Sequence, residues 1–99
     1  MYAPEVARHV QPIAVKYHSR IRRTIDEQLS FAPSEPTRNR KPLEDPPGPF
    51  GSTWELRCGP ANRFRVFYEI VLSTHQVWVL AIGVKDRDRL FFAGKEFNS

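Results

Sequence analysis

The chain has 99 residues, 15 of them Lys or Arg and 11 Asp or Glu, which gives a formal net charge of +4. This length predicts one domain, residues 1–99, and a hydrophobic content of 40% excludes a chain that is disordered throughout. The excess of positive charge favours an anionic partner, either a nucleic acid or an acidic protein.

The sequence indicates a protein of the reducing cytoplasm that makes no contact with a membrane. It has a single cysteine, Cys58, which cannot form an intramolecular disulfide. No apolar signal segment opens the chain, and no run approaches the roughly 18 apolar residues of a spanning helix. The cysteine and the three histidines lack the close spacing of metal ligands, so we expect no metal and no cofactor.

Residues 4–30 are predicted to form two short helices. Their apolar side chains recur every three or four residues, as on one face of a helix. Pro12 lacks a backbone N–H and Ser19 can cap a second helix, so we expect a hairpin of about residues 4–16 and 20–30. The apolar stripe consists of Val6, Val10, Ile13, Tyr17, Ile21, Ile25 and Leu29.

Residues 32–52 are predicted to form an extended loop, because they contain six prolines and two glycines. The loop carries the cations Arg38, Arg40 and Lys41. Two interpretations stay open: these cations contact phosphates at the mouth of a site, or they pair with the nearby acids Glu35, Glu44 and Asp45.

Three runs, residues 54–57, 63–72 and 76–85, are predicted to be strands of an antiparallel meander, since their connections are too short for a parallel crossover. Period-two alternation places one set of side chains in the core: Trp54, Leu56, Phe64, Val66, Tyr68, Ile70, Trp78, Leu80, Ile82 and Val84. The opposite face receives the cations Arg57, Arg63, Arg65 and Lys85, with Glu55 and Phe67, beside Val79, Ala81 and Gly83. Residues 90–97 are predicted to be a last short strand or a turn of helix.

The cations of the second face suit an anionic transition state. When RNA is cleaved by its own 2′-hydroxyl, negative charge builds on the phosphate, and Arg or Lys can stabilise that charge. We therefore predict a phosphate clamp of Arg57, Arg65 and Lys85, with Arg65 dispensable for folding. The alternative is that these cations form cross-strand ion pairs with Glu55, Glu69 and Asp86.

The order of these blocks resembles the RelE/ParE superfamily of bacterial type II toxins. The resemblance is carried by a helix hairpin, then T-R-N-R-K-P-L, W-E-L-R, F-R-V-F-Y-E-I, V-L-A-I-G-V-K and R-L-F-F-A-G-K-E-F, and it spans about residues 4–97. It implies an α+β fold, a helix hairpin packed on a small twisted antiparallel sheet. Members usually open with a strand before the hairpin, and here residues 1–3 are short for one, so we expect that strand to be short or missing.

The resemblance also implies an activity and partners. The leading hypothesis is ribosome-dependent cleavage of mRNA, which makes the chain a possible endoribonuclease that inhibits translation. It implies catalytic roles for Arg65, Lys85 and Arg57, and RNA-backbone contacts by Arg38, Arg40, Lys41, Arg63 and Arg87. The expected partners are a cognate acidic antitoxin, the ribosome and mRNA.

Two alternatives stay open, a ParE-like poison of DNA gyrase and a degenerate domain that only binds antitoxin. They are favoured by three positions where the chain departs from the RelE pattern. Thr53 and Glu55 stand where RelE has two lysines, and Phe91 matches the tyrosine that RelE uses in acid–base chemistry.

Overall fold

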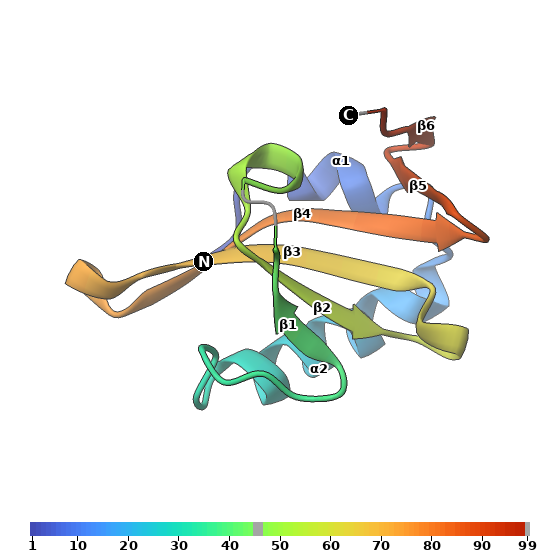
Figure 1. Cartoon of the computed structure of the whole chain (residues 1–99). Coiled ribbons are helices and arrows are strands. Elements are labelled where there is room, and N and C mark those ends of the chain that lie inside the picture. Colours follow the sequence, from blue (N-terminus) through green and yellow to red (C-terminus); the bar gives the residue numbers. More distant parts are fainter. Residues whose placement is uncertain (45–46, 99) are drawn as a thin grey trace.

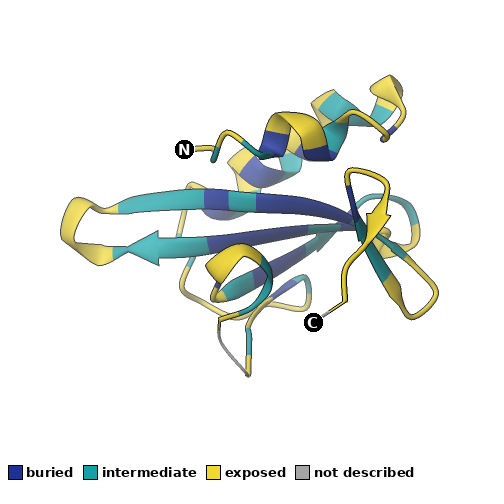
Figure 2. Ribbon diagram, turned by 90° about the horizontal axis from the view of Figure 1, so that it is seen from above, coloured by how far each residue is buried: buried dark blue, intermediate teal, exposed yellow. Residues whose placement is uncertain are grey.

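The computed structural model of the chain describes residues 1–44 and 47–98. Two α-helices, α1 (Val6–Val10) and α2 (His18–Leu29), are joined by a 3₁₀ turn, η1 (Val15–Tyr17). They cover one side of an antiparallel sheet (Figures 1 and 2). The predicted α+β class is therefore confirmed.

The helix boundaries differ from the predicted ones. The first helix ends at Val10 rather than at residue 16, because Pro12 has no N–H with which to continue the hydrogen-bond ladder. The second begins at His18, and its N-cap residue, Tyr17, makes no side-chain cap. The prediction that Ser19 caps this helix was wrong.

The predicted apolar stripe does face the sheet. Val6, Ile13, Ile21, Ile25 and Leu29 are buried, and they pack with the inward-facing residues of the strands in one cluster, the main core. Burying each such aliphatic side chain contributes roughly 1.5–3 kcal/mol, so this contact fixes the helices on the sheet.

The sheet has six strands that follow one another in chain order. Every neighbouring pair is antiparallel, so the predicted meander is confirmed, and residues 90–97 form two short strands rather than a helical turn. A further strand lies inside the loop predicted for residues 32–52. The strands are β1 (Arg40–Pro42), β2 (Trp54–Cys58), β3 (Phe64–Val71), β4 (Gln76–Asp86), β5 (Arg89–Phe92) and β6 (Lys95–Glu96).

The N-terminal residues form a short strand-like segment at the edge of β4. Tyr2 makes a parallel bridge with Val79, the Ala3 N–H donates to the Val79 carbonyl at 2.8 Å, and the Val79 N–H donates to the Met1 carbonyl at 2.8 Å. The expectation of a short strand before the helices agrees with this geometry.

The register of β3 and β4 shifts by one residue in mid-strand, where consecutive β3 residues face Ala81 and then Val79. Leu80 is left without a partner, and the alternation reverses toward the start of β4. Val79 is therefore buried in the main core, where the sequence placed Leu80 and Trp78. That prediction was wrong because period-two alternation assumes an uninterrupted ladder.

A second, smaller core lies on the sheet face opposite the helices. It consists of Phe67, Ala81 and Phe92, with Leu43 and Leu90 packed against it. The turn η2 (Pro49–Gly51) and strand β5 cover this part of the face. Within the described residues, no helix has the length and apolarity needed to cross a bilayer.

Candidate nucleic-acid interface

Strand register brings four cations onto the sheet face opposite the helices. Arg57 lies directly opposite Arg65, and Lys41 lies opposite Glu55. Lys85 extends from the same face of β4 as Ala81 and Gly83, because side chains on a strand alternate. We call this surface the basic face, defined by Lys41, Arg57, Arg65 and Lys85.

A carboxylate lies between the two arginines. Glu55 Oε2 is 3.5 Å from Arg65 Nη1, and Glu55 Oε1 is 3.7 Å from Arg57 Nε. Arg65 also donates from Nε to the Asn62 carbonyl at 3.0 Å. Both ion-pair separations exceed a normal hydrogen-bond length and neither is bidentate, so an incoming anion can compete with Glu55 for these arginines.

These contacts change what was expected of Arg65. Its side chain is only 13% exposed, and that of Glu55 only 11%, whereas that of Arg57 is 37% exposed. The premise that Arg65 is exposed and unpaired is wrong, and we now expect its loss to destabilise the fold, because it removes the nearer partner of a nearly buried carboxylate. Of the predicted cross-strand ion pairs, only Arg65–Glu55 forms among the described residues, and Arg57 pairs with Glu55 along its own strand, β2.

The loop cations separate into two groups. Arg38 and Lys41 are exposed, as phosphate contacts require. Arg40 is buried on the helix side, where its guanidinium donates to the carbonyls of Glu35 (2.8 Å), Ala32 (3.0 Å) and Gln28. These acceptors lie at and beyond the C-terminus of α2, so Arg40 fixes the loop to the helix. The prediction that it contacts RNA is corrected accordingly.

The alternative interpretation of the loop cations, pairing with nearby acids, is not seen for Glu35 and Glu44 among the described residues. The third proposed partner, Asp45, lies outside the described residues.

Two further predicted RNA contacts lie away from the basic face. Arg63 precedes β3 in a helical conformation and lines a cavity of about 190 Å³ with the helix-side residues Ile13 and Tyr17. Arg87 is exposed in the turn between β4 and β5, with a φ of 58°. Only the Arg63 backbone adjoins the basic face, where its carbonyl accepts a hydrogen bond from the Lys85 N–H at 2.7 Å, and its side chain lines that cavity; Arg87 lies beyond the end of β4.

The aromatic residue that faces the cations is Phe92, not Phe91. Phe91 lies opposite Val84, so it shares the helix-side face of the sheet, and Phe92 belongs to the second core. A Cβ added at Gly83 would lie 2.9 Å from the Phe92 ring and 2.9 Å from the Leu90 side chain. Because Gly83 has no side chain, the Leu90 and Phe92 side chains of β5 can pack on the sheet beside Arg65. Composition alone did not indicate this role.

His9 closes the edge of the sheet. It is buried at the end of α1, and its Nδ1 accepts a hydrogen bond from the Ile82 N–H at 3.2 Å. Its ring also contacts those of Phe50 and Phe92, at centroid distances of 5.1 and 5.3 Å. Burial lowers the pKa of His9, and Arg8 lowers it further. The neutral imidazole thus accepts a hydrogen bond from the Ile82 N–H, which lies on the side of β4 where β5 does not extend.

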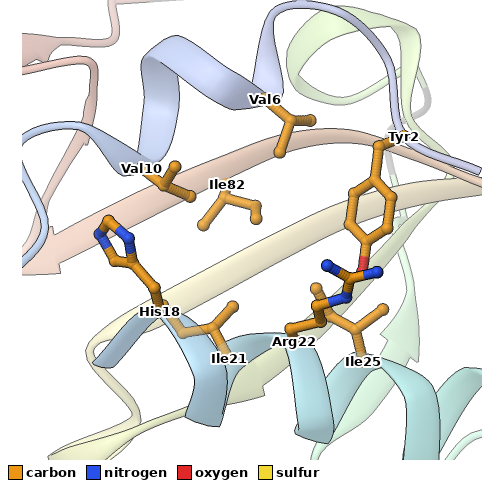
Figure 3. A pocket seen from close by; sticks show the side chains of 8 residues that line it. All are labelled: Tyr2, Val6, Val10, His18, Ile21, Arg22, Ile25 and Ile82. Carbon is orange, nitrogen blue, oxygen red and sulfur yellow. The ribbon is translucent and has the colours of Figure 1, made fainter. Parts of the chain in front are cut away.

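An apolar cavity of about 250 Å³ lies on the helix side, between α1, α2 and β4 (Figure 3). The Tyr2 side chain extends across its mouth toward Arg22 and Ile25, and His18 lies at the other end. Burial raises the pKa of Tyr2, which keeps its hydroxyl neutral. The other lining residues are Val6, Val10, Ile21 and Ile82.

Other chemistry has little support in the described residues. Burial raises the pKa of the Cys58 thiol to about 11, which disfavours the thiolate needed for nucleophilic attack. No group of three or more His, Cys, Asp or Glu side chains within the described part of the chain could hold a metal ion.

Comparison of the chain with known protein families, with curated proteins and with solved structures gave no match.

Proposed function

We propose that this chain is the toxin of a type II toxin–antitoxin pair of the RelE/ParE kind, and that it inhibits translation by cleaving mRNA at the ribosome. The observation that carries the proposal is the basic face, where Arg57, Arg65 and Lys85 project from three adjacent strands and the two arginines flank one carboxylate. A face of this composition on a rigid sheet suits the phosphates of an extended RNA strand.

The proposed reaction uses the 2′-hydroxyl of the RNA as nucleophile. Arg57 and Arg65 exchange their single contacts with Glu55 for the oxygens of the scissile phosphate, and they stabilise the charge that builds there. In this proposal Glu55, within 3.7 Å of both guanidinium groups, accepts the 2′-hydroxyl proton. The 2′-oxygen bonds to phosphorus, the bond to the 5′-oxygen breaks, and Lys85 donates the proton that this leaving oxygen requires. The products are a 2′,3′-cyclic phosphate and a 5′-hydroxyl.

The test is to induce the wild type and two variants in cells and to map mRNA 5′ ends. Removing one transition-state cation should lower the cleavage rate by roughly a hundredfold to a thousandfold in Arg65→Ala and Arg57→Ala. Arg65→Ala also removes a partner of Glu55 and should cost about 1–3 kcal/mol of stability, so urea unfolding of the purified variant must accompany it. Arg57→Ala is the cleaner variant because its side chain is more exposed. Arg23→Ala, which removes an exposed cation of α2, is the matched control.

The other two hypotheses predict different outcomes of this experiment. The position of Phe91 on the helix-side face and the pairing of Arg65 with Glu55 favour a domain without nuclease activity. Toxicity with intact mRNA and broken DNA would identify a gyrase poison. Wild-type protein that is folded and abundant but harmless would identify a domain that only binds antitoxin.

The proposed antitoxin is an acidic protein, and the helix-side cavity offers it a second contact. An apolar side chain of the partner can enter the cavity, and a carboxylate beside it can pair with Arg22 at the rim. This surface is on the opposite side of the sheet from the basic face. Arg22→Glu should therefore weaken antitoxin binding and leave mRNA cleavage by the free toxin unchanged, with Arg23→Glu as the control.

A further inference from the structure

Three phenylalanine rings form a cluster beside the basic face. Phe92 is buried at its centre, with ring centroids 5.1 Å from Phe50 and 5.6 Å from Phe97, both in edge-on geometry. Phe50 belongs to the turn η2 and Phe97 follows β6, where its N–H donates to the Leu90 carbonyl at 2.7 Å. We call these residues, Phe50, Phe92 and Phe97, the phenylalanine cluster.

The cluster adjoins the proposed phosphate site. Arg65 lies directly opposite Gly83 across β3 and β4, and the Phe92 ring lies against Gly83. Phe67, two residues along β3 from Arg65, also contacts the Phe92 ring at a centroid distance of 5.7 Å. Arg65 and the Phe92 ring are therefore neighbours across one strand pair, and Phe50 and Phe97 pack against that ring.

Two of the three rings are left in contact with solvent. Phe50 is 49% exposed and Phe97 is 37% exposed, although Phe67 and Phe92, which they adjoin on the same face, are buried. Phe50 also has a φ of 58°, a left-handed conformation that is costly for a bulky residue. Its neighbours Pro49 and Gly51 hold the turn that imposes it. Such strain persists where the surroundings enforce it, and it is concentrated at binding sites.

We propose that Phe50 and Phe97 form a stacking site for a base of single-stranded RNA whose phosphates lie on the basic face. This inference rests on the proposed function and adds to it the part of the RNA that is recognised. Unpaired bases stack on aromatic side chains with little dependence on sequence, and a neighbouring row of cations follows the backbone. Charge favours RNA over a protein segment as the occupant, because both open rings pack on Phe92, and the Phe92 ring lies against Gly83, the residue opposite Arg65.

The test measures binding of two fluorescent probes by anisotropy: the hexanucleotide of adenylate, and an abasic hexamer with the same ribose-phosphate backbone. Loss of one stacked base should weaken adenylate binding by about fivefold to a hundredfold in Phe50→Ala and in Phe97→Ala. Binding of the abasic hexamer should not change, and Phe50→Trp should retain adenylate binding. The matched control is Phe31→Ala, because Phe31 is 83% exposed just beyond the end of α2 and belongs neither to the phenylalanine cluster nor to the basic face.

The outcomes separate this inference from the function on which it rests. If the wild type binds both hexamers equally, or if neither Phe50→Ala nor Phe97→Ala weakens adenylate binding, the stacking site is refuted and RNA binding stands. An equal loss in Phe31→Ala would also refute it. If the wild type binds neither hexamer, the stacking site is refuted, and mapping of mRNA 5′ ends in cells decides separately whether the chain cleaves mRNA at the ribosome. Arg57→Ala should weaken both hexamers alike, since a phosphate contact is independent of the base.

Discussion

Replacement of Arg40 by alanine should be among the most destabilising single changes in this chain. Its guanidinium binds three backbone carbonyls, those of Gln28, Ala32 and Glu35, and a fourth acceptor, the Gln28 side-chain oxygen at 3.3 Å. The first two carbonyls belong to the last turn of α2 and the loop that follows it, where helical partners run out. The positive charge of Arg40 also interacts favourably with the negative, C-terminal end of the α2 dipole.

The magnitude follows from these contacts. Each charge-assisted hydrogen bond is worth roughly 1.5–3 kcal/mol, and water can replace part of it once the side chain is gone. We expect Arg40→Ala to lower the free energy of unfolding by about 3–5 kcal/mol. A chain of this length has a total stability of roughly 5–15 kcal/mol, and the melting temperature should fall by roughly 15–30 °C.

Urea unfolding of the purified variants measures this effect. Lys41→Ala is the matched control, since it removes the neighbouring cation from an exposed position on the same strand. Arg40→Lys should give an intermediate loss, because a single ammonium group cannot reach all three carbonyls. A loss for Arg40→Ala below about 1 kcal/mol, or one equal to that of Lys41→Ala, would refute the structural role and restore Arg40 as a candidate for RNA binding.

Three further predictions concern other parts of the molecule. The folded state holds the pKa of His9 below its ordinary value, so as pH falls the unfolded chain binds a proton on His9 before the folded chain does. The free energy of unfolding should therefore be full above about pH 6.5 and should decline below it. This decline should be smaller in His9→Gln, as measured by urea unfolding at several pH values. Gly83→Val should displace the Leu90 side chain and the Phe92 ring and cost roughly 1–3 kcal/mol in urea unfolding. A loss below about 0.5 kcal/mol, as for an ordinary surface change, would show that the space above Gly83 is not needed. Association with the proposed antitoxin should slow as salt rises from low to physiological strength, where charges are screened over about 8 Å. A rate that does not depend on salt in stopped-flow measurements would exclude an electrostatic docking surface.

Hydrophobic periodicity was sufficient to predict most of the fold. The apolar stripe from Val6 to Leu29 is buried as expected, and the short connections between strands determined their antiparallel order. The failures have local causes. A bulge at Leu80 reverses the alternation that placed Trp78 in the core, and such an insertion leaves no mark in the pattern of apolar residues. The strand Arg40–Pro42 was not predicted, because it lies in a proline-rich segment that resembles a loop. It forms through its pairing with β2 and not because of its own composition.

The candidate site was predictable to the extent that it lies on regular strands. Alternation placed Arg57, Arg65 and Lys85 correctly, since their side-chain direction follows from strand period alone. It could not show that Glu55 lies between two of them, nor that Arg40 turns to the helix side, because both depend on tertiary contacts. The phenylalanine cluster was missed for the same reason: its members come from a turn, a strand and the C-terminal segment, which are not adjacent in the chain.

The position of Glu55 links stability to the proposed chemistry. A carboxylate that is nearly buried needs its arginines, so it holds Arg57 and Arg65 in place before RNA arrives, at the cost of competing with the phosphate for them. Glu55→Gln removes this competition and the buried charge together, while it keeps a side chain of the same shape. We expect this variant to bind the abasic hexamer more tightly than the wild type, because both guanidinium groups are then free, and to cleave mRNA more slowly, because an amide cannot accept the 2′-hydroxyl proton. Tighter binding with undiminished cleavage would show that Glu55 only positions the arginines, and weaker binding would show that without it they no longer face the phosphate.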